Sequence, residues 1–199
     1  MPIMSFSVAV LAGAALVVFS GALWLAAVGA LALWASWAYT GGKSPYGYRG
    51  LGEVVVFVFF GPVATAGTAY VQAGLVPWES LVTGTAMGLF AAAVLLLNNL
   101  RDIGPDEQAG KQTLAVRIGA LASKSLVTVL FVLPYALLAL LFAMFPWSVV
   151  VLLTGVLVVI AGARVWRGKS PAALISALQD TSLASLLYAG LLSLTMIVS

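Results

Sequence analysis

The sequence contains no cysteine and no histidine. These absences exclude disulfides, thiolate nucleophiles, histidine-ligated zinc and any catalytic triad built on histidine. Charge is also scarce, because Asp, Glu, Lys and Arg make up 8% of the residues, against about 25% in a typical soluble domain. Any chemistry in this chain must therefore use carboxylates, amides, phenols, amines, guanidinium groups or a hard metal ion.

The rest of the composition is strongly apolar. Hydrophobic residues make up 63% of the chain, and its mean hydropathy is +1.14. This predicts an all-α membrane protein, since about 20 apolar residues in a helix cross the hydrocarbon of a bilayer. The apolar runs indicate a bundle of about seven transmembrane helices. Their expected ranges are 3–19, 22–39, 53–71, 79–99, 121–143, 147–165 and 171–198.

The nine basic residues fall into three of the connections between these helices, whereas the turns near 20, 72–80 and 144–147 have none. The three groups are Lys43 and Arg49; Arg101, Lys111, Arg117 and Lys124; and Arg164, Arg167 and Lys169. By the positive-inside rule these loops face the cytoplasm, which predicts a multi-pass protein of the plasma membrane. Because the cations sit beside membrane ends, we expect no nucleic-acid partner.

One of the basic loops also holds an acidic cluster. Asn98, Asp102 and Asp106 recur at four-residue spacing, which on a helix projects three oxygen-bearing side chains along one face. Mg²⁺ prefers such oxygens, with one or two carboxylates completed by waters and substrate phosphates. Because Pro105 interrupts the pattern, we expect Asn98 and Asp102 at the end of the fourth helix and Asp106 on the loop beyond it. Alternatively, Pro105, Asp106 and Glu107 open a short helix.

Two stretches resemble motifs of the UbiA superfamily of intramembrane prenyltransferases. Residues 98–119, NNLRDIGPDEQAGKQTLAVRIG, are similar to the second aspartate-rich motif of that family. Residues 39–53, YTGGKSPYGYRGLGE, are similar to a cytoplasmic loop of the same family, with Tyr39 and Lys43 spaced as Tyr-x-x-x-Lys. Within the superfamily, the sequences of these two motifs are most similar to those of the 1,4-dihydroxy-2-naphthoate polyprenyltransferases, and a weaker resemblance extends over the whole chain.

The resemblance implies Mg²⁺-dependent transfer of a polyprenyl group from a polyprenyl diphosphate to 1,4-dihydroxy-2-naphthoate, with loss of CO₂, to form demethylmenaquinone in the lipid bilayer. In that reading, Asn98, Asp102 and Asp106 are the catalytic residues and hold the metal on the diphosphate. The implied substrate-binding residues are Lys43, Tyr39, Arg101, Lys111, Arg49 and Asn99. Plainer roles exist for several of them, because Tyr39 fits an interfacial aromatic belt and the basic residues fit orientation-setting or lipid-binding cations.

The resemblance also has a gap. A typical family member has a further helix pair before the helix with which this chain begins, and that pair carries a first aspartate-rich motif. No second motif of this kind exists here, since the six acids are Glu53, Glu79, Asp102, Asp106, Glu107 and Asp180. The chain is therefore expected to be one partial transmembrane prenyltransferase domain over residues 1–199, with little activity unless a separate N-terminal helix pair is supplied.

Other functions stay open on the residues alone. Another aromatic acceptor, such as 4-hydroxybenzoate, fits the same motifs, and a transporter or a noncatalytic remnant of the family also explains polar groups in an apolar bundle. The acids lie mostly at helix ends and no internal repeat is visible, which disfavours a transporter. The choice of general base is open among Asp, Glu, Tyr and the departing diphosphate. Glu53 fits a helix-start carboxylate, and Asp180, about 14 Å into its helix, has no assigned role.

Overall fold

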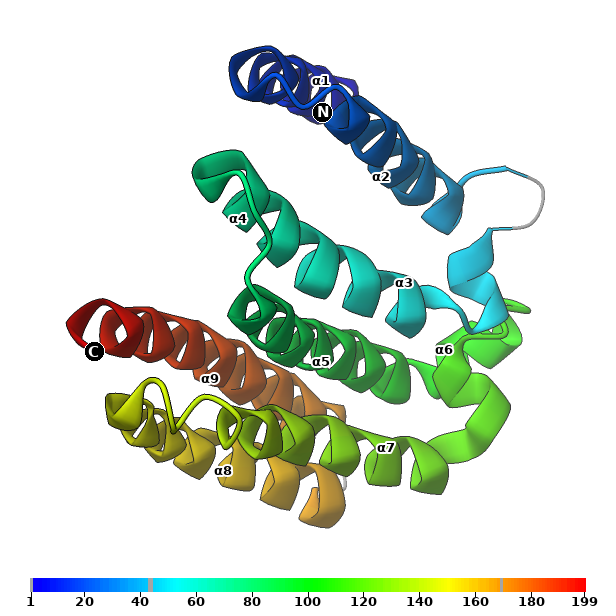
Figure 1. The fold of residues 1–199 in the computed structure, drawn as a ribbon. Coiled ribbons are helices and arrows are strands. Elements are labelled where there is room, and N and C mark those ends of the chain that lie inside the picture. Colours follow the sequence, from blue (N-terminus) through cyan, green and yellow to red (C-terminus); the bar gives the residue numbers. More distant parts are fainter. Residues whose placement is uncertain (1, 43–44, 169) are drawn as a thin grey trace.

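The computed structural model describes residues 2–42, 45–168 and 170–199, and this described part consists of helices joined by turns, without strands (Figure 1). The helices in chain order are α1 (Pro2–Ser20), α2 (Trp24–Thr40), the 3₁₀ turn η1 (Tyr46–Arg49), α3 (Gly52–Val58), the π-helical turn η2 (Phe59–Val63), α4 (Ala64–Ala73), α5 (Trp78–Arg101), α6 (Ile103–Gln108), α7 (Leu114–Leu138), the 3₁₀ segment η3 (Pro146–Thr154), α8 (Gly155–Arg167) and α9 (Pro171–Val198). The all-α prediction is confirmed.

Seven long rods make up the described bundle, because α3, η2 and α4 continue one another, as do η3 and α8. This confirms the expectation of about seven helices. Five rods are long and apolar enough to cross a membrane, and α1 and α2 are shorter apolar helices. Many large apolar side chains point outward from the rods, including Leu186 at 68% and Val159 at 73% exposure. The chain is a multi-pass membrane protein, in which these side chains face lipid.

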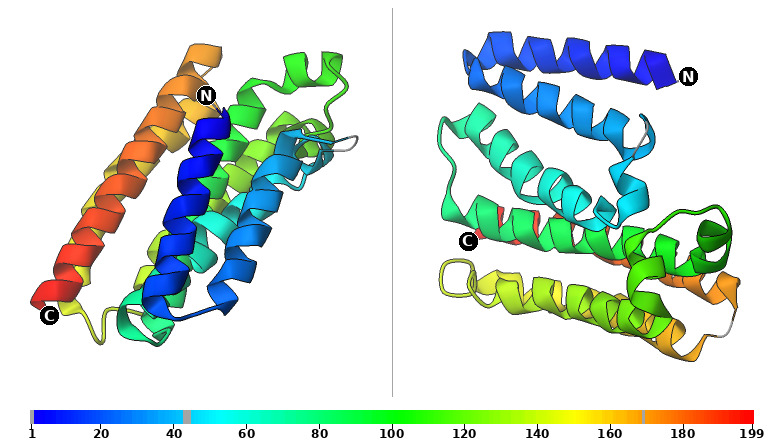
Figure 2. Two further views of the ribbon diagram at one scale, coloured as in Figure 1. Left: turned by 90° about the horizontal axis from the view of Figure 1, so that it is seen from above. Right: turned by 90° about the vertical axis from the view of Figure 1, so that its right-hand side faces the viewer.

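The connections between rods alternate between two ends of the bundle. The η1 turn, α6 and the junction of α8 with α9 lie at one end, which we call the motif end, whereas the α1–α2, α4–α5 and α7–α8 turns lie at the other (Figures 1 and 2). The C-terminus is also at that other end. Trp78 and Trp147 sit next to two of the far turns and are 45% and 61% exposed, as an interfacial aromatic belt requires.

The helix α5 lies at the centre of the bundle and packs against α3, η2, α7 and α9. Its buried side includes small residues such as Ala86 and Ala93, which let neighbouring helices approach closely. On the same helix, the Phe90 ring packs edge to face against Tyr135, with ring centroids 6.2 Å apart, and against Tyr188, with ring centroids 5.3 Å apart. The core therefore holds α5 firmly along its length and presents its last turn at the motif end.

A kink in the rod of α3, η2 and α4 brings its main chain directly against α5. Gly61 has non-helical angles (φ −112°, ψ −105°) and Pro62 follows it. A Cβ atom on Gly61 would lie 2.5 Å from the Gly84 carbonyl oxygen, and one on Gly88 would lie 2.5 Å from the Phe57 carbonyl oxygen. Only glycine therefore permits this helix spacing.

The fifth helix differs most from its expected range. It was expected over 121–143, whereas α7 begins at Leu114 and ends at Leu138. The extra residues at its start include Arg117, whose charge interrupts the apolar run from which the range was predicted. Gly119, also among them, has non-helical backbone angles (φ +78°) and marks a kink. Residues 139–145 are apolar but form turns, because the chain reverses there into η3. Apolarity alone does not separate a helix from the turn that follows it.

Candidate active site

Asn98, Asp102 and Asp106 lie where α5 ends and α6 begins. The backbone continues to wind through this junction, because the Asp102 amide donates to the Asn98 carbonyl oxygen (3.2 Å) and the Asp106 amide donates to that of Asp102 (2.8 Å). The expected positions of Asn98 and Asp102 at the helix end are confirmed. The expected loop position of Asp106 is wrong, since Ile103–Gln108 forms α6. Pro105 lies in the first turn of α6, where its missing amide hydrogen is not needed.

Both carboxylates of this junction are paired with cations. Arg101 donates from Nε and Nη2 to the two oxygens of Asp102, at 2.7 and 2.6 Å. Lys111 contacts Asp106 Oδ1 at 3.1 Å, and Asp106 is 7% exposed. The Arg101 hydrogen bonds lower the pKa of Asp102, and the Asp106 carboxylate raises the pKa of Lys111. Each carboxylate of the junction therefore has a basic side chain as its partner.

The same lysine connects two loops at the motif end. The Lys111 ammonium lies 5.1 Å from the centroid of the Tyr48 ring, in a cation–π contact. Beside it, the Gln112 amide donates to the Tyr48 carbonyl oxygen at 2.9 Å, and Arg117 Nε donates to the Gln112 carbonyl oxygen at 3.1 Å. The η1 turn is thereby joined to the segment before α7. This contact brings together the two stretches that carry the family resemblance.

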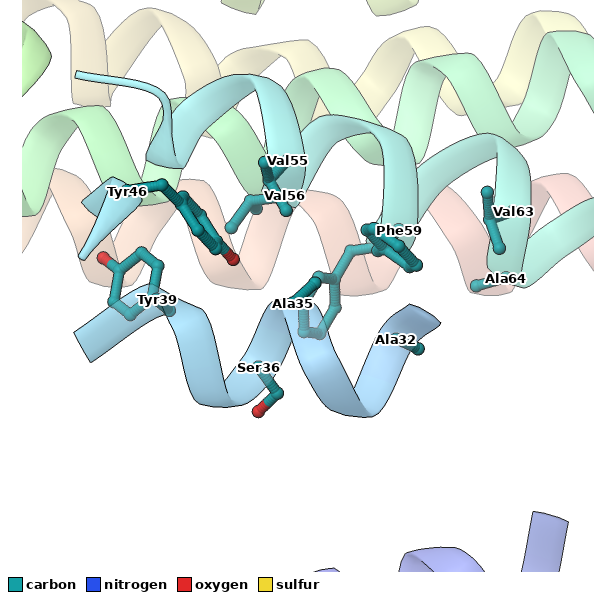
Figure 3. A pocket seen from close by; sticks show the side chains of 11 residues that line it. Ala32, Ala35, Ser36, Tyr39, Tyr46, Val55, Val56, Phe59, Val63 and Ala64 are labelled. Carbon is teal, nitrogen blue, oxygen red and sulfur yellow. The ribbon is translucent and has the colours of Figure 1, made fainter. Parts of the chain in front are cut away.

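An apolar hollow opens beside these loops, between α2 and the rod of α3, η2 and α4. Its volume is about 590 Å³, and Tyr39 and Tyr46 lie at one end of it while Val63 and Ala64 lie at the other (Figure 3). The two tyrosine rings meet edge to face with centroids 5.6 Å apart. Burial raises the pKa of Tyr46, so its phenol keeps its proton at neutral pH and can donate a hydrogen bond.

A second apolar hollow, of about 510 Å³, lies between α5, α9 and the rod of α3, η2 and α4. Asn98 is among the residues that line it, together with Leu95 and Phe90. Val56 and Phe60 line both hollows and therefore stand between them. The polar junction of α5 and α6 thus begins where an apolar hollow ends, an arrangement that suits a lipid with a charged head group.

Asn99 faces a different partner from its neighbour Asn98. Its side-chain amide donates to Glu53 Oε1 at 2.8 Å, and both residues are buried. Sequence reasoning had no basis for joining them, because 46 positions separate them and helix periodicity relates residues only within one helix. The available signal was that an acid and an amide both occur at helix ends on the same side of the bundle.

The remaining predicted residues are less constrained. Arg49, the last residue of η1, is exposed and forms no ion pair with the described residues. Lys43 lies outside the described residues, so its predicted contact with substrate has no structural counterpart. Tyr39, Asn98, Asn99, Arg101, Asp102, Asp106 and Lys111 all lie at the motif end of the bundle or line the hollows that reach it.

These residues fit a metal ion only together with a phosphorylated ligand. Across the described ranges, no three acidic side chains come close enough to enclose a metal. Mg²⁺ at phosphate sites needs fewer, since one or two carboxylates, waters and the phosphate oxygens complete its shell. Asp102 and Asp106 supply two carboxylates on successive turns, and Arg101 and Lys111 are cations suited to phosphate oxygens. The donor set therefore fits Mg²⁺ shared with a diphosphate.

Comparison with known proteins identifies the family of this chain. Residues 3–194 match the model of the UbiA prenyltransferase family. The chain is 45% identical over 185 residues to a protein of Mycobacterium tuberculosis named 1,4-dihydroxy-2-naphthoate octaprenyltransferase, covering 93% of this chain and 63% of that protein. It is 39% identical over 163 residues to the protein of that name in Escherichia coli, covering 80% of this chain and 53% of that protein.

A more distant similarity reaches animals. The chain is 42% identical over 100 residues to UbiA prenyltransferase domain-containing protein 1 of Gallus gallus, covering 50% of this chain and 30% of that protein. No solved structure matches the chain. The match to the family model covers nearly every described rod, and the chain therefore belongs to the UbiA prenyltransferase family.

Proposed function

We propose that this chain takes part in the Mg²⁺-dependent transfer of a polyprenyl group from a polyprenyl diphosphate to 1,4-dihydroxy-2-naphthoate. The product is demethylmenaquinol, the reduced form of demethylmenaquinone, and the ring carboxyl group leaves as CO₂. One observation carries the proposal: two carboxylates, each paired with a cation, stand on successive helical turns at the head of an apolar hollow. The names of the bacterial relatives support the choice of acceptor.

The residues divide into three roles. Asn98, Asp102 and Asp106 hold Mg²⁺ on the diphosphate, and bound Mg²⁺ neutralises charge on the leaving diphosphate. Arg101, Lys111 and Lys43 bind its remaining oxygens, with Arg49 at the rim. Tyr39 lies beside the donor head group, and Asn99 supports the site. These roles share one physical basis, because they stabilise charge that is greatest as the leaving group departs.

The bonds that change are simple to follow. The allylic carbon–oxygen bond of the donor breaks, and its electron pair leaves with the diphosphate. The ring carbon that carries the carboxylate forms the new carbon–carbon bond. The carbon–carboxylate bond then breaks, its electron pair restores the aromatic ring, and CO₂ departs. The apolar hollows keep water away from the allylic cation, which would otherwise be hydrolysed.

The chain spans 63% of the length of its Mycobacterium tuberculosis relative. We propose that residues 1–199 act as a single transmembrane domain together with an N-terminal helix pair that carries another aspartate-rich motif. Without that pair, part of the charge stabilisation is missing, and transfer by the 199-residue chain alone is weak or absent.

The assay that tests the proposal uses purified protein in detergent, with Mg²⁺, farnesyl diphosphate and either 1,4-dihydroxy-2-naphthoate or 4-hydroxybenzoate. The chain is tested alone and co-expressed with an N-terminal helix pair of the family. Mass spectrometry should detect a prenylated, decarboxylated naphthoquinol with the pair present. Prenylated 4-hydroxybenzoate as the sole product would overturn the choice of acceptor, and robust turnover by the chain alone would overturn the need for the pair.

Matched variants separate the site from general damage. Asp102→Asn and Asp106→Asn should each abolish turnover, because each removes a metal-binding charge. Glu107→Gln is the control, since Glu107 is an exposed acid on the same short helix and forms no ion pair with the described residues. Loss of turnover in all three variants would contradict the assigned roles. Solute flux in liposomes without any transferase product would instead favour a transporter.

Membrane sidedness is tested in the plasma membrane of intact cells, where the motif end is proposed to face the cytoplasm. The chain has no cysteine, so single-cysteine labelling needs no prior changes. Leu75→Cys, in an exposed turn at the far end, should react with an impermeant maleimide in intact cells. Ala109→Cys, after α6, should react only after permeabilisation. The reverse pattern would contradict the proposed orientation.

A further inference from the structure

The contact between Glu53 and Asn99 is the least expected polar contact in the bundle. The two residues are only 5% and 7% exposed, and the Asn99 amide donates to Glu53 Oε1 at 2.8 Å. The other carboxyl oxygen, Glu53 Oε2, is buried without a partner among the described residues. Burying a polar atom without a partner is unfavourable. Such a group calls for a role other than filling space.

The position of this contact suggests that role. Val56 on α3 lies one turn after Glu53 on the same helical face, and Phe60 follows in η2; both line the two hollows. On α5, Asn99 directly follows Asn98, which lines the second hollow. The Glu53–Asn99 contact therefore lies one helical turn beyond the apolar lining, level with the start of the metal-binding junction.

Apolar packing holds α5 along its length, and the contact between Glu53 and Asn99 adds a directional bond at its end. A Cβ atom on Gly52 would lie 3.3 Å from Leu95 Cδ2 and 3.3 Å from Tyr39 Cε2, so α3 starts in close apolar contact with both. Apolar contact is non-directional, whereas a hydrogen bond depends on the direction of its donor. The bond between Glu53 and Asn99 is the directional contact that the structure provides here.

Building on the function proposed above, we infer that Glu53 is a positioning residue: by accepting the Asn99 hydrogen bond it holds the end of α5 against α3, so that Asn98 and Asp102 face the diphosphate. A helix turns by about 100° and rises by about 1.5 Å per residue, so a slip of one residue would carry both ligands away from the site. Glu53 acts through Asn99 and touches neither metal nor substrate.

Glu53 could instead act through the helix dipole or carry a proton, and each of these roles predicts a different effect of substitutions at Glu53 and Asn99. A carboxylate that only favours the helix start through the dipole needs no partner on α5, so changing Asn99 would have no effect on the site. A carboxyl that carries a proton in the reaction needs to remain on α3, so an isosteric amide in its place would abolish function. A positioning role needs only one donor and one acceptor, on either helix.

The isosteric pair of side chains permits a direct swap. Glu53→Gln keeps an oxygen that accepts from Asn99 and should resemble the parent. Asn99→Asp removes the amide donor and places a second carboxyl group against Glu53, so like-charge repulsion should disrupt the contact. The double variant Glu53→Gln/Asn99→Asp restores one donor and one acceptor with their positions exchanged, and it should recover the parent behaviour.

Two measurements report on the swap in the chain co-expressed with the N-terminal helix pair and purified in detergent. Hydrogen exchange of the amides of residues 98–106 reports on the order of the junction without any ligand. Binding of Mn²⁺ in the presence of geranyl diphosphate, followed by electron paramagnetic resonance, reports on the metal site without turnover. Tyr188→Phe is the matched control, because it removes a buried interhelical hydrogen bond, from Tyr188 to the Pro134 carbonyl oxygen at 2.9 Å, far from the junction.

The expected result is specific. Asn99→Asp should speed exchange at residues 98–106 and weaken Mn²⁺ binding, each by about tenfold. Glu53→Gln and the double variant should stay within about threefold of the parent, and Tyr188→Phe should lower Tm while leaving exchange at 98–106 and Mn²⁺ binding unchanged. Failure of the double variant to recover, or a loss in Glu53→Gln as large as in Asn99→Asp, would overturn the positioning role.

The two measurements also keep the two proposals apart. If exchange follows the swap while the parent binds no Mn²⁺ with the diphosphate, the proposed prenyl-transfer site fails and the positioning of the α5 end stands. If the parent binds Mn²⁺ but exchange ignores the swap, the positioning role fails and the proposed function stands.

Discussion

The Arg101 guanidinium group lies against the Asp102 carboxylate in a two-point contact, with Nε 2.7 Å from Oδ1 and Nη2 2.6 Å from Oδ2. The two residues are neighbours in sequence, so the contact exists wherever the last turn of α5 is formed. Side-chain exposures of 29% and 31% show that the pair is within reach of solvent. A phosphate oxygen can therefore replace the carboxylate as the partner of Arg101 without any change in the helix.

The Arg101–Asp102 pair should give stability a defined pH dependence. Arg101 lowers the pKa of Asp102 in the folded chain, so its stabilising effect is complete above the ordinary Asp pKa of about 4 and is lost as pH falls through the lowered value. The Tm difference between the parent and Arg101→Gln should stay constant from about pH 7 to 5 and shrink below about pH 4. A difference that grows on acidification would contradict this sign.

Lys111 should matter more for donor binding than for folding. It is held by Asp106 and the Tyr48 ring, and both contacts place its charge beside the proposed metal-binding junction. In the active assembly, Lys111→Met should raise the KM for the polyprenyl diphosphate about tenfold, since one charged hydrogen bond is worth about 1.5–3 kcal/mol. Lys124→Met, which removes a cation from α7 outside the site, is the control. Equal effects of the two changes would argue for a general charge effect.

The glycine contacts between the kinked rod and α5 should tolerate no side chain. Gly61→Ala would place a Cβ atom 2.5 Å from the Gly84 carbonyl oxygen, a main-chain atom that cannot rotate away. We expect a loss of about 1–3 kcal/mol, measured as a drop in Tm in detergent. Gly190→Ala on α9 meets nothing within 4 Å and should be neutral or slightly stabilising. An unchanged Tm in Gly61→Ala would refute the close approach.

Asp180 should prove structural. Its Oδ2 lies 2.6 Å from Arg164 Nη1, which joins α9 to α8 as a charge contact without hydrogen-bond geometry. Because the pair is intermediate between exposed and buried, Asp180→Asn should reduce stability by roughly 1–2 kcal/mol. The double variant Asp180→Leu/Arg164→Met should be more stable than Asp180→Leu alone and than Arg164→Met alone, because no unpaired charge remains. Detergent Tm measurements on the four proteins test this, and additive losses would count against it.

The sequence predicted the rods and the gathering of basic loops because both depend on composition. Apolar runs set the lengths of helices in a bilayer, and the odd and even connections of a bundle fall at opposite ends. The exceptions have local causes. The charge of Arg117 excluded the first turn of α7 from the apolar run, and Pro105 was expected to interrupt the helical pattern but lies in the first turn of α6. A proline has opposite meanings at the first turn and in the interior of a helix.

The sequence predicted which residues belong to the candidate site, but it did not predict which of them contact one another. The spacing of Asn98, Asp102 and Asp106 placed them on successive turns, because helix geometry is local. The pairing of Glu53 with Asn99 and of Asp180 with Arg164 joins different helices, and no spacing rule reaches from one helix to the next. Those pairings depend on the rotation of each helix about its axis, which is set by packing of the finished bundle.

The glycine seam at Gly61, Gly84 and Gly88 carries a last consequence for the length of the prenyl tail. Because main chain meets main chain there, backbone contacts limit the separation of α5 from the kinked rod. Phe60 and Met87 precede Gly61 and Gly88 in the sequence and are among the residues that line the second hollow, so the size of their side chains affects its width. Under the proposed function, trimming or enlarging these two side chains should change the room for isoprene units while the helices around them keep their spacing.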